Sequence, residues 1–430
     1  MPHASRVLLL ACLLVAVAPL PGCNGGGGTT TSGGFPTIDR AAVVGDDGEA
    51  GDEIRVDVYL DATTSMEGYV GAGTEYAEFL RSLEEQLITT WGESDVAFYR
   101  FGTRVDSVGR DGFLSARTDL PFYRAPDVFR ETRIDSVLAR TADDRLAVVV
   151  TDLFQDAGDT NALVSQIKDR VFGGGLALAV MAVESAFDGT VYDAPGGAYR
   201  YASDPTDPAS GRPFYALVVG APAQVERLLT TLEGTRGVRR DRVLVVSPFV
   251  VEDYRLELTK QGVPSDDSRG VNIGAVDGDT YRLVVRDDHD GGRLRGTLAL
   301  TPRDNVADVA PDRVELVAFR RGPGEADSSR TTDVEIADVA RSDDGLAFDF
   351  VLDVDGPPGD YAYLLQFQAG EVGGQTLPGW VRDLSTEAPT ADADPNRTLN
   401  LERLLGALVQ AAATERRPLL AQAALSLDKQ

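Results

Sequence analysis

Residues 54–66 read IRVDVYLDATTSM, and this stretch indicates both the fold and the place of a candidate site. Its first part, Ile54–Leu60, has the β-branched and apolar residues that are typical of a strand. The strand ends in Asp61, and Thr63 and Ser65 follow at every second position. The sequence therefore places one carboxylate and two hydroxyls directly after a strand, at the carboxyl edge of its sheet.

Strand and helix patterns alternate between residues 53 and 250. We expect strands at Val96–Phe101, Leu146–Val150, Leu176–Val183, Phe214–Val219 and Arg242–Val246, and helices at Thr74–Thr90, Ile134–Arg140, Thr160–Val171 and Ala223–Leu232. The run Leu146–Val150 is apolar throughout, which is typical of a parallel strand covered by helices on both faces. The sequence predicts an α/β domain over residues 53–250, with a doubly wound, mainly parallel, Rossmann-like sheet. Its ligand site is expected at the carboxyl ends of the strands.

Two later segments bring further oxygen atoms to the same edge. Thr132 stands just before a predicted helix, and Asp152 follows the strand Leu146–Val150. Hard divalent cations bind oxygen ligands, and Mg²⁺ accepts a mixture of hydroxyls, carboxylates and retained waters. The set that provides this mixture is Asp61, Thr63, Ser65, Thr132 and Asp152. The simpler interpretation is a strand-end acid followed by hydroxyls that cap the next turn.

In this order, the segments resemble the metal-ion-dependent adhesion site of von Willebrand factor type A (vWA) domains. That family has Asp-x-Ser-x-Ser after the first strand, a Thr before a mid-domain helix and an Asp after the fourth strand. The one departure is Thr63 in place of the first Ser, which keeps the oxygen and adds a methyl group. The resemblance implies that the hydroxyls bind Mg²⁺, or Mn²⁺ or Ca²⁺, directly, while Asp61 and Asp152 act largely through waters. It also implies that an Asp or Glu carboxylate of a partner protein completes the coordination shell.

The pattern changes after residue 262 to period-two alternation without helices. Strands are expected at Tyr281–Arg286, Leu294–Leu300, Arg313–Arg320, Asp333–Ala337, Leu346–Leu352 and Tyr361–Ala369. Their spacing predicts a β-sandwich over residues 268–386, and residues 356–363 resemble a turn of immunoglobulin-like (Ig-like) bacterial modules. A C-terminal helical segment is expected over residues 397–425, with one apolar face made of Leu401, Leu404, Leu405 and Leu408. Such a face docks on its own domain or recruits a partner.

The first 22 residues have the layout of a secretory signal peptide, with Arg6, the apolar run Val7–Ala18 and the ending Leu-Pro-Gly-Cys at residues 20–23. The apolar run is shorter than the roughly 20 residues that span a bilayer. The ending resembles the bacterial lipobox, which implies a lipid on Cys23. An ordinary signal peptide with a coincidental Cys is the alternative. Residues 23–52 are expected to form a flexible tether, so the sequence predicts a lipoprotein of the bacterial cell envelope, anchored at the outer membrane or the cell surface.

The composition limits the classes of function. With 41 Lys and Arg against 68 Asp and Glu, the net charge of −27 argues against a nucleic-acid partner. After removal of the signal peptide the chain keeps one Cys, Cys23, and one His, His289. One Cys and one His are too few for an internal disulfide or a Cys/His zinc cluster, and a Cys–His nucleophilic pair is excluded as well. Neither a G-x-S-x-G elbow nor a G-x-x-x-x-G-K-[ST] phosphate loop occurs.

These observations favour a binding or scaffolding module over an enzyme. A metal-dependent phosphohydrolase is the alternative from another class, because a strand that ends in Asp also begins the site of haloacid dehalogenases. That family needs a second Asp two residues later, where Thr63 stands. A structural spacer with a vestigial metal site is a third interpretation. We expect a membrane-tethered protein-binding module that depends on a divalent cation.

Overall fold

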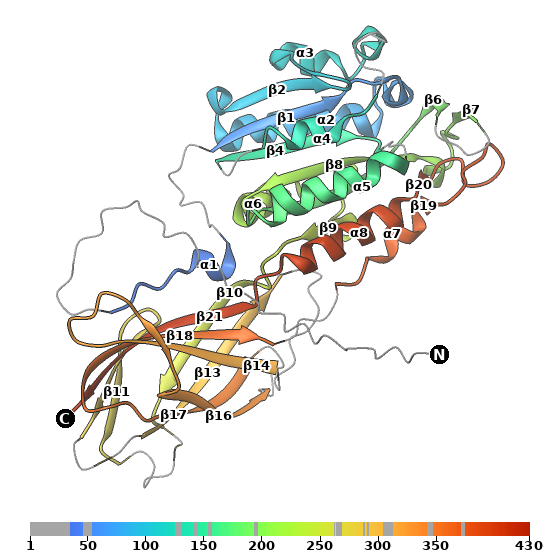
Figure 1. Cartoon of the computed structure of the whole chain (residues 1–430). Helices are drawn as coiled ribbons and strands as arrows, with labels where there is room; N and C mark the ends of the chain where they lie inside the picture. The colour runs from blue at the N-terminus through green and yellow to red at the C-terminus, as the bar shows by residue number, and fades with distance from the viewer. Residues whose placement is uncertain are drawn as a thin grey trace, which may run out of the picture. The chain divides into compact units, whose positions relative to one another are not determined.

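Strand β1 (Arg55–Asp61) lies inside a seven-stranded sheet with the order β3-β2-β1-β4-β8-β5-β9 (Figure 1). The other strands are β2 (Val96–Phe101), β3 (Val105–Ser107), β4 (Arg145–Thr151), β5 (Ala177–Ser185), β8 (Arg212–Gly220) and β9 (Val243–Val246). The computed structural model describes residues 35–45, 54–124, 131–141, 144–153, 157–192, 197–261, 263, 269–286, 289, 292–303, 313–341, 347–370 and 375–430. β1 and β4 are buried along nearly their whole length, as strands inside a covered sheet must be.

The expectation of a mainly parallel sheet is wrong, because the sheet is mixed. β1 pairs in parallel with β2 and β4, whereas β8 pairs antiparallel with β4 and β5. The connection from β5 to β8 passes through a hairpin, β6 (Asp188–Val191) and β7 (Tyr199–Ala202), and has no α-helix in its described residues. A strand that returns without a crossover helix starts at the edge where its predecessor ended, so it runs antiparallel to that predecessor.

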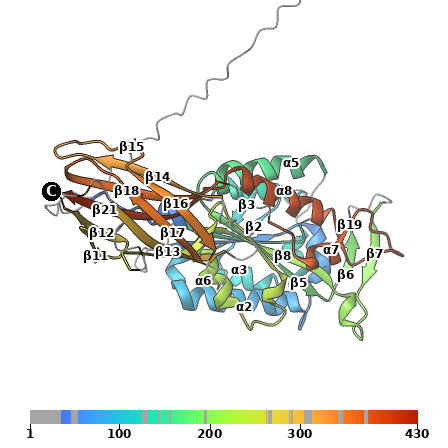
Figure 2. The ribbon, with the colours of Figure 1, turned by 90° about the horizontal axis from the view of Figure 1, so that it is seen from below.

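Helices cover both faces of this sheet, which confirms the α/β class. α2 (Glu75–Trp91) and α6 (Pro222–Leu232) pack on one face, and α5 (Ala157–Gln166) and α8 (Leu401–Thr414) pack on the other (Figure 2). The short helices are α1 (Ala41–Val44), α3 (Gly109–Ser115), α4 (Ile134–Leu138), α7 (Gly379–Asp383), η1 (Thr64–Tyr69), η2 (Glu93–Asp95), η3 (Leu120–Tyr123), η4 (Ile167–Phe172), η5 (Pro208–Ser210) and η6 (Arg240–Arg242).

Two further sheets share a second core. One has four strands, β10 (Val251–Thr259), β13 (Gly292–Pro302), β17 (Ala347–Val354) and β16 (Val334–Arg341), in that order. The other has six strands in the order β11 (Val271–Asp277), β12 (Thr280–Val285), β21 (Leu419–Lys429), β18 (Gly359–Ala369), β14 (Val314–Arg321) and β15 (Ser329–Thr331). Phe350 and Phe367 come from different sheets, and their ring centroids lie 5.0 Å apart in this core.

The C-terminal segment 397–425 is helical only in part. After α8 the chain enters β21, which pairs in parallel with β12 and antiparallel with β18. Residues 419–425 read LLAQAAL, a composition that favours a helix. Burial between two strands of a sheet decides the conformation here, because tertiary packing overrides a weak local propensity.

The apolar face of α8 is buried against the α/β layer. Leu401, Leu404, Leu405 and Leu408 share a core with Val149, which lies on β4. The face therefore docks within this chain, as one of the two interpretations expected.

Residues 35–45, expected in the flexible tether, pack against the β strands. Val43 and Val44 of α1 are buried in the second core, and Arg40 forms ion pairs with Asp253 and Asp279. The two valines are the sequence feature that distinguishes this stretch from the glycine-rich residues before it. Residues 35–430 form one compact unit.

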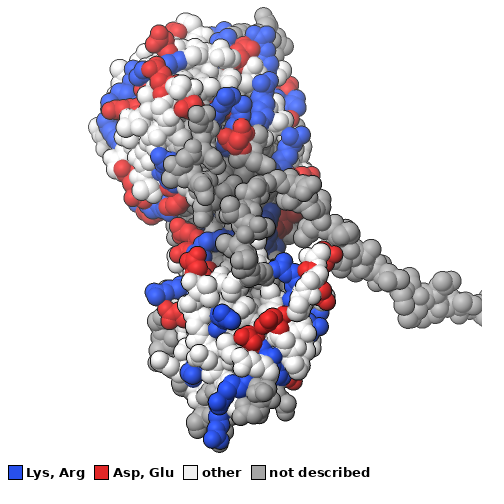
Figure 3. Space-filling view, turned by 90° about the vertical axis from the view of Figure 1, so that its left-hand side faces the viewer, with Lys and Arg blue, Asp and Glu red and all other residues white. Residues whose placement is uncertain are grey.

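The signal peptide at residues 1–22, Cys23, and residues 24–34 and 46–52 of the expected tether lie outside the described residues. No described helix is both long and apolar enough to cross a membrane. On the described part of the face in Figure 3, acidic and basic side chains are interspersed rather than gathered by sign.

Candidate metal centre

The five residues expected to bind a cation come from three segments that meet at the carboxyl ends of β1 and β4. Leu60 of β1 pairs in parallel with Val150 of β4, so Asp61 comes to lie beside Thr151 at the end of the two strands. Thr63 precedes η1, in which Ser65 lies, and Thr132 lies two residues before α4. The set Asp61, Thr63, Ser65, Thr132 and Asp152 is buried, with exposed fractions between 0% and 7%.

The Asp61 carboxylate accepts four hydrogen bonds. Its Oδ1 accepts from the backbone N–H of Thr63 at 3.0 Å and from the Thr63 hydroxyl at 2.7 Å. Its Oδ2 accepts from the hydroxyls of Thr132 at 3.1 Å and Thr151 at 2.8 Å. A hydroxyl has one proton and two lone pairs. Because the hydroxyls of Thr63 and Thr132 donate hydrogen bonds to Asp61, their lone pairs remain available to a further partner.

The three hydroxyls expected to bind the cation lie close together. Thr63 Oγ1 is 3.1 Å from Ser65 Oγ and 3.4 Å from Thr132 Oγ1. Mg²⁺ binds oxygen at 2.0–2.1 Å in an octahedron, in which neighbouring ligands are about 3.0 Å apart. The two spacings are close to that value, so Thr63 and Ser65, and likewise Thr63 and Thr132, fit neighbouring positions of such a shell.

Two carboxylates share this buried place. Burial raises the pKa of Asp61 from 3.8 to about 6, the charge of Asp152 adds to the rise, and the hydrogen bonds from Thr63 and Thr151 oppose it. The burial and the nearby negative charge both disfavour the ionised form of Asp61. A cation placed among these groups would favour that form, so the donor set fits a hard divalent ion in charge as well as in spacing.

The backbone is strained immediately after Asp152. Leu153 has φ +56°, in the left-handed region that a Leu side chain rarely adopts. Its N–H donates to the Thr151 hydroxyl at 3.2 Å, which holds the turn that leaves β4. Strain of this kind costs of order 1–3 kcal/mol and persists where the surrounding structure requires a particular geometry. Here it fixes the chain on both sides of Asp152.

The sequence reasoning misses the role of Thr151. This residue lies in the segment that was singled out for Asp152, and its hydroxyl reaches the same Asp61 oxygen as Thr132. The five residues of β4 before it, 146–150, are all apolar and buried, so this part of the strand has no alternation that would predict where the hydroxyl points. The sequence feature that could have predicted this role is the presence of a polar residue at the end of an otherwise apolar strand.

A second group of unpredicted neighbours comes from the C-terminal segment. Tyr215 of β8 pairs with Thr151 across the sheet, and its hydroxyl lies 2.8 Å from that of Thr398. Arg212 donates to the backbone carbonyls of Pro395 at 3.0 Å and Arg397 at 3.1 Å. Strands β19 (Ser385–Thr386) and β20 (Thr398–Leu399) accordingly lie near β6 and β7 at this end of the sheet (Figure 1). Residues 395–398 therefore flank the site on its β8 side.

A scan against protein-family models and a search of curated proteins both gave no match. Among the described residues, no group of three or more His, Cys, Asp or Glu is placed to hold a metal ion. The candidate centre has two carboxylates, and its remaining ligands are hydroxyls. Its assignment therefore rests on the convergence of these oxygen atoms.

Proposed function

We propose that this chain is a membrane-tethered, divalent-cation-dependent protein-binding or scaffolding module of the bacterial cell envelope. The observation that carries the proposal is the convergence of three hydroxyls beside the buried Asp61: Thr63 Oγ1 lies 3.1 Å from Ser65 Oγ and 3.4 Å from Thr132 Oγ1. In this proposal, the α/β part is a vWA-like domain and the two packed sheets are an Ig-like sandwich. The parallel trio β2-β1-β4 with helices on both faces supports the first assignment.

In the proposed site, some residues position the cation and others supply negative charge. Thr63, Ser65 and Thr132 would hold Mg²⁺, Mn²⁺ or Ca²⁺ through neutral oxygens, and Asp61 orients Thr63 and Thr132 by accepting hydrogen bonds from their hydroxyls. When bound, the cation supplies an incompletely neutralised positive charge that attracts a carboxylate. Asp152 supplies a second buried negative charge beside Asp61. The partner is accordingly a protein that presents an Asp or Glu side chain.

The tether is the second part of the proposal. A lipid on Cys23 and the glycine-rich residues after it would hold the compact unit near a membrane while leaving it free to meet partners. The support for this part is the sequence of residues 1–34.

The function is tested by partner capture from an envelope extract. The purified chain is mixed with the extract, either in the presence of Mg²⁺ or in the presence of a chelator, and bound proteins are then cross-linked to it. The Asp152→Ala variant is treated in the same way. We expect one set of partners to be captured in Mg²⁺ alone and to be missing with Asp152→Ala. The matched control is Asp119→Ala, which removes an exposed carboxylate elsewhere in the α/β part. Capture that survives chelation would contradict the mechanism, and Mg²⁺-dependent hydrolysis of an aryl phosphate would favour the phosphohydrolase instead.

A further inference from the structure

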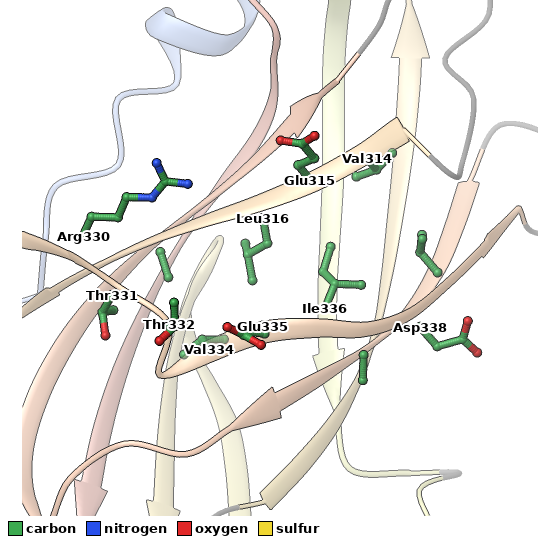
Figure 4. A pocket seen from close by; sticks show the side chains of 13 residues that line it. Val314, Glu315, Leu316, Arg330, Thr331, Thr332, Val334, Glu335, Ile336 and Asp338 are labelled. Carbon is green, nitrogen blue, oxygen red and sulfur yellow. The ribbon is translucent and has the colours of Figure 1, made fainter. Parts of the chain in front are cut away.

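A groove opens in the β part of the chain between strands β14 and β16 (Figure 4). Its volume is about 640 Å³. Leu316 of β14 and Ile336 of β16 lie on its two sides, and Val339 extends its apolar lining. All three are partly buried and pack against the core between the two sheets. The groove is therefore a place where the apolar interior reaches the surface.

Both strands that border the groove have an edge without a strand partner in the described part of the chain. β16 pairs antiparallel with β17 and ends the four-stranded sheet. β14 pairs with β15 only across Ala318–Arg320, so its residues 314–317 have no described partner on that side. An open edge presents backbone N–H and C=O groups to which an extended segment can add as a new strand.

The charge around the groove is mostly negative. Its lining includes three carboxylates and one guanidinium, which belong to Glu315, Glu335, Asp338 and Arg330. All four side chains are exposed, and none forms an ion pair with another described residue.

A register shift places two of these acids on the outer face of β16. The shift lies between Ile336 and Asp338. As a result Glu335 and Asp338 are exposed, while Ile336 and Val339 pack toward the core. The edge thus presents an apolar inner row and an acidic outer row.

The charges argue against a second copy of this chain as the occupant. Pairing β16 with itself would bring Glu335 and Asp338 near their own counterparts, and like charges across a strand pair are destabilising. The net charge of −27 adds a long-range repulsion between copies. A strand with Lys or Arg at its outward positions would form pairs of opposite charge at the same places.

We propose that the β16 edge is a docking site for an extended, basic segment of another protein. The segment pairs with β16 as a fifth strand of the four-stranded sheet. Its alternate apolar side chains lie against Leu316, Ile336 and Val339 and close the groove, while its basic side chains lie beside Glu335 and Asp338. Main-chain pairing supplies the affinity, and side-chain pockets and charges supply the specificity. The residues involved are separate from those of the candidate metal centre, so docking does not depend on the cation.

The test uses a fluorescent nine-residue peptide of alternating Lys and Val, titrated with the purified chain and followed by anisotropy. A peptide of the same sequence with N-methyl groups on every residue carries the same charge but has no backbone N–H donor on either edge, so it cannot pair as a strand. A peptide of alternating Glu and Val has the opposite charge. We expect the Lys–Val peptide to bind at least tenfold more tightly than either control, with and without a chelator.

The charge-reversed variant Glu335→Lys/Asp338→Lys distinguishes peptide binding at the β16 edge from non-specific electrostatic binding to an acidic protein. We expect it to bind the Lys–Val peptide at least tenfold more weakly and the Glu–Val peptide more tightly than the unchanged protein does. The matched variant Glu387→Lys/Asp392→Lys changes two exposed acids in the C-terminal segment and should leave both affinities unchanged. Hydrogen exchange should slow on Val334–Arg341 when the Lys–Val peptide is bound.

Three results would overturn the proposal. One is equal binding of the N-methylated and unmodified peptides, which would indicate charge attraction without strand pairing. Another is equal loss of affinity in the two double variants. The third is an absence of binding, or of slowed exchange on β16, at peptide concentrations up to 1 mM.

Discussion

The pKa of Asp61 makes a quantitative prediction about stability and pH. In the folded chain this pKa is raised from 3.8 to about 6, first by burial and then by the charge of Asp152. Between these two pH values the folded state binds a proton that the unfolded state has lost, so stability falls as the pH rises. Roughly two pH units correspond to about 3 kcal/mol. Asp61→Asn keeps the shape of the side chain and removes its charge, so it should remove this dependence.

The assay is urea unfolding of the unchanged protein and of the Asp61→Asn variant between pH 4 and pH 7, in the presence of a chelator. The chain has two tryptophans, Trp91 and Trp380, and both pack against cores of the α/β part, so fluorescence reports its unfolding. The free energy of unfolding of the unchanged protein should fall, relative to the variant, by about 2 kcal/mol over this range, because at pH 4 the unfolded carboxylate is already more than half ionised. Mg²⁺ should then restore stability at pH 7 to the unchanged protein and not to the variant.

A difference between the two proteins that stays flat or grows with pH would refute this reasoning. It would mean that Asp61 ionises in the folded state as easily as in the unfolded chain. The burial of two carboxylates around the hydroxyls would then be no reason to expect a cation there.

Three further predictions concern the site, the packing of α8 and the tether. Thr63→Val removes a hydroxyl that donates to Asp61 at 2.7 Å, so it should lower Mg²⁺ affinity in calorimetry at least tenfold, whereas Thr64→Val next to it should not. Leu405→Ala empties a fully buried position of α8 and should lower the free energy of unfolding in urea by about 3 kcal/mol. The exposed Arg403→Ala should change it by less than about 0.5 kcal/mol. Cys23→Ala removes the proposed lipid site and should move the protein from detergent-extracted membranes to the soluble fraction, as membrane fractionation would show.

The sequence predicts the meeting of the site residues because strand ends are easy to locate. Asp61 and Asp152 each follow an apolar run, and parallel neighbours in a sheet end at the same edge. The structure brings both residues, with Thr63, Ser65 and Thr132, to that edge. Thr151 and Thr398 could not be predicted in the same way. The first lies in a strand without alternation, and the second reaches Tyr215 from 183 positions further along the chain.

Two features of the fold could not be predicted, because the composition of the strand itself does not decide them. The residues of β8 read as a buried strand, but its direction follows from the hairpin β6–β7 before it rather than from its own composition. The residues of β21 favour a helix locally and become a strand because β12 and β18 pair with both of its edges. The deciding segment for β8 directly precedes it, whereas the deciding partners of β21 lie far away in the sequence.

The most direct measurement for the proposed cation site is Mg²⁺ binding by calorimetry to the unchanged protein and to Asp152→Ala. Asp152 is buried beside Asp61 at the end of β4, and removing its carboxylate leaves the apolar body of that strand intact. The account predicts one Mg²⁺ per chain in the unchanged protein and an affinity at least tenfold lower in a variant whose circular dichroism is unaltered. Equal affinity in the two folded proteins, or no Mg²⁺ binding to the unchanged protein, would contradict it.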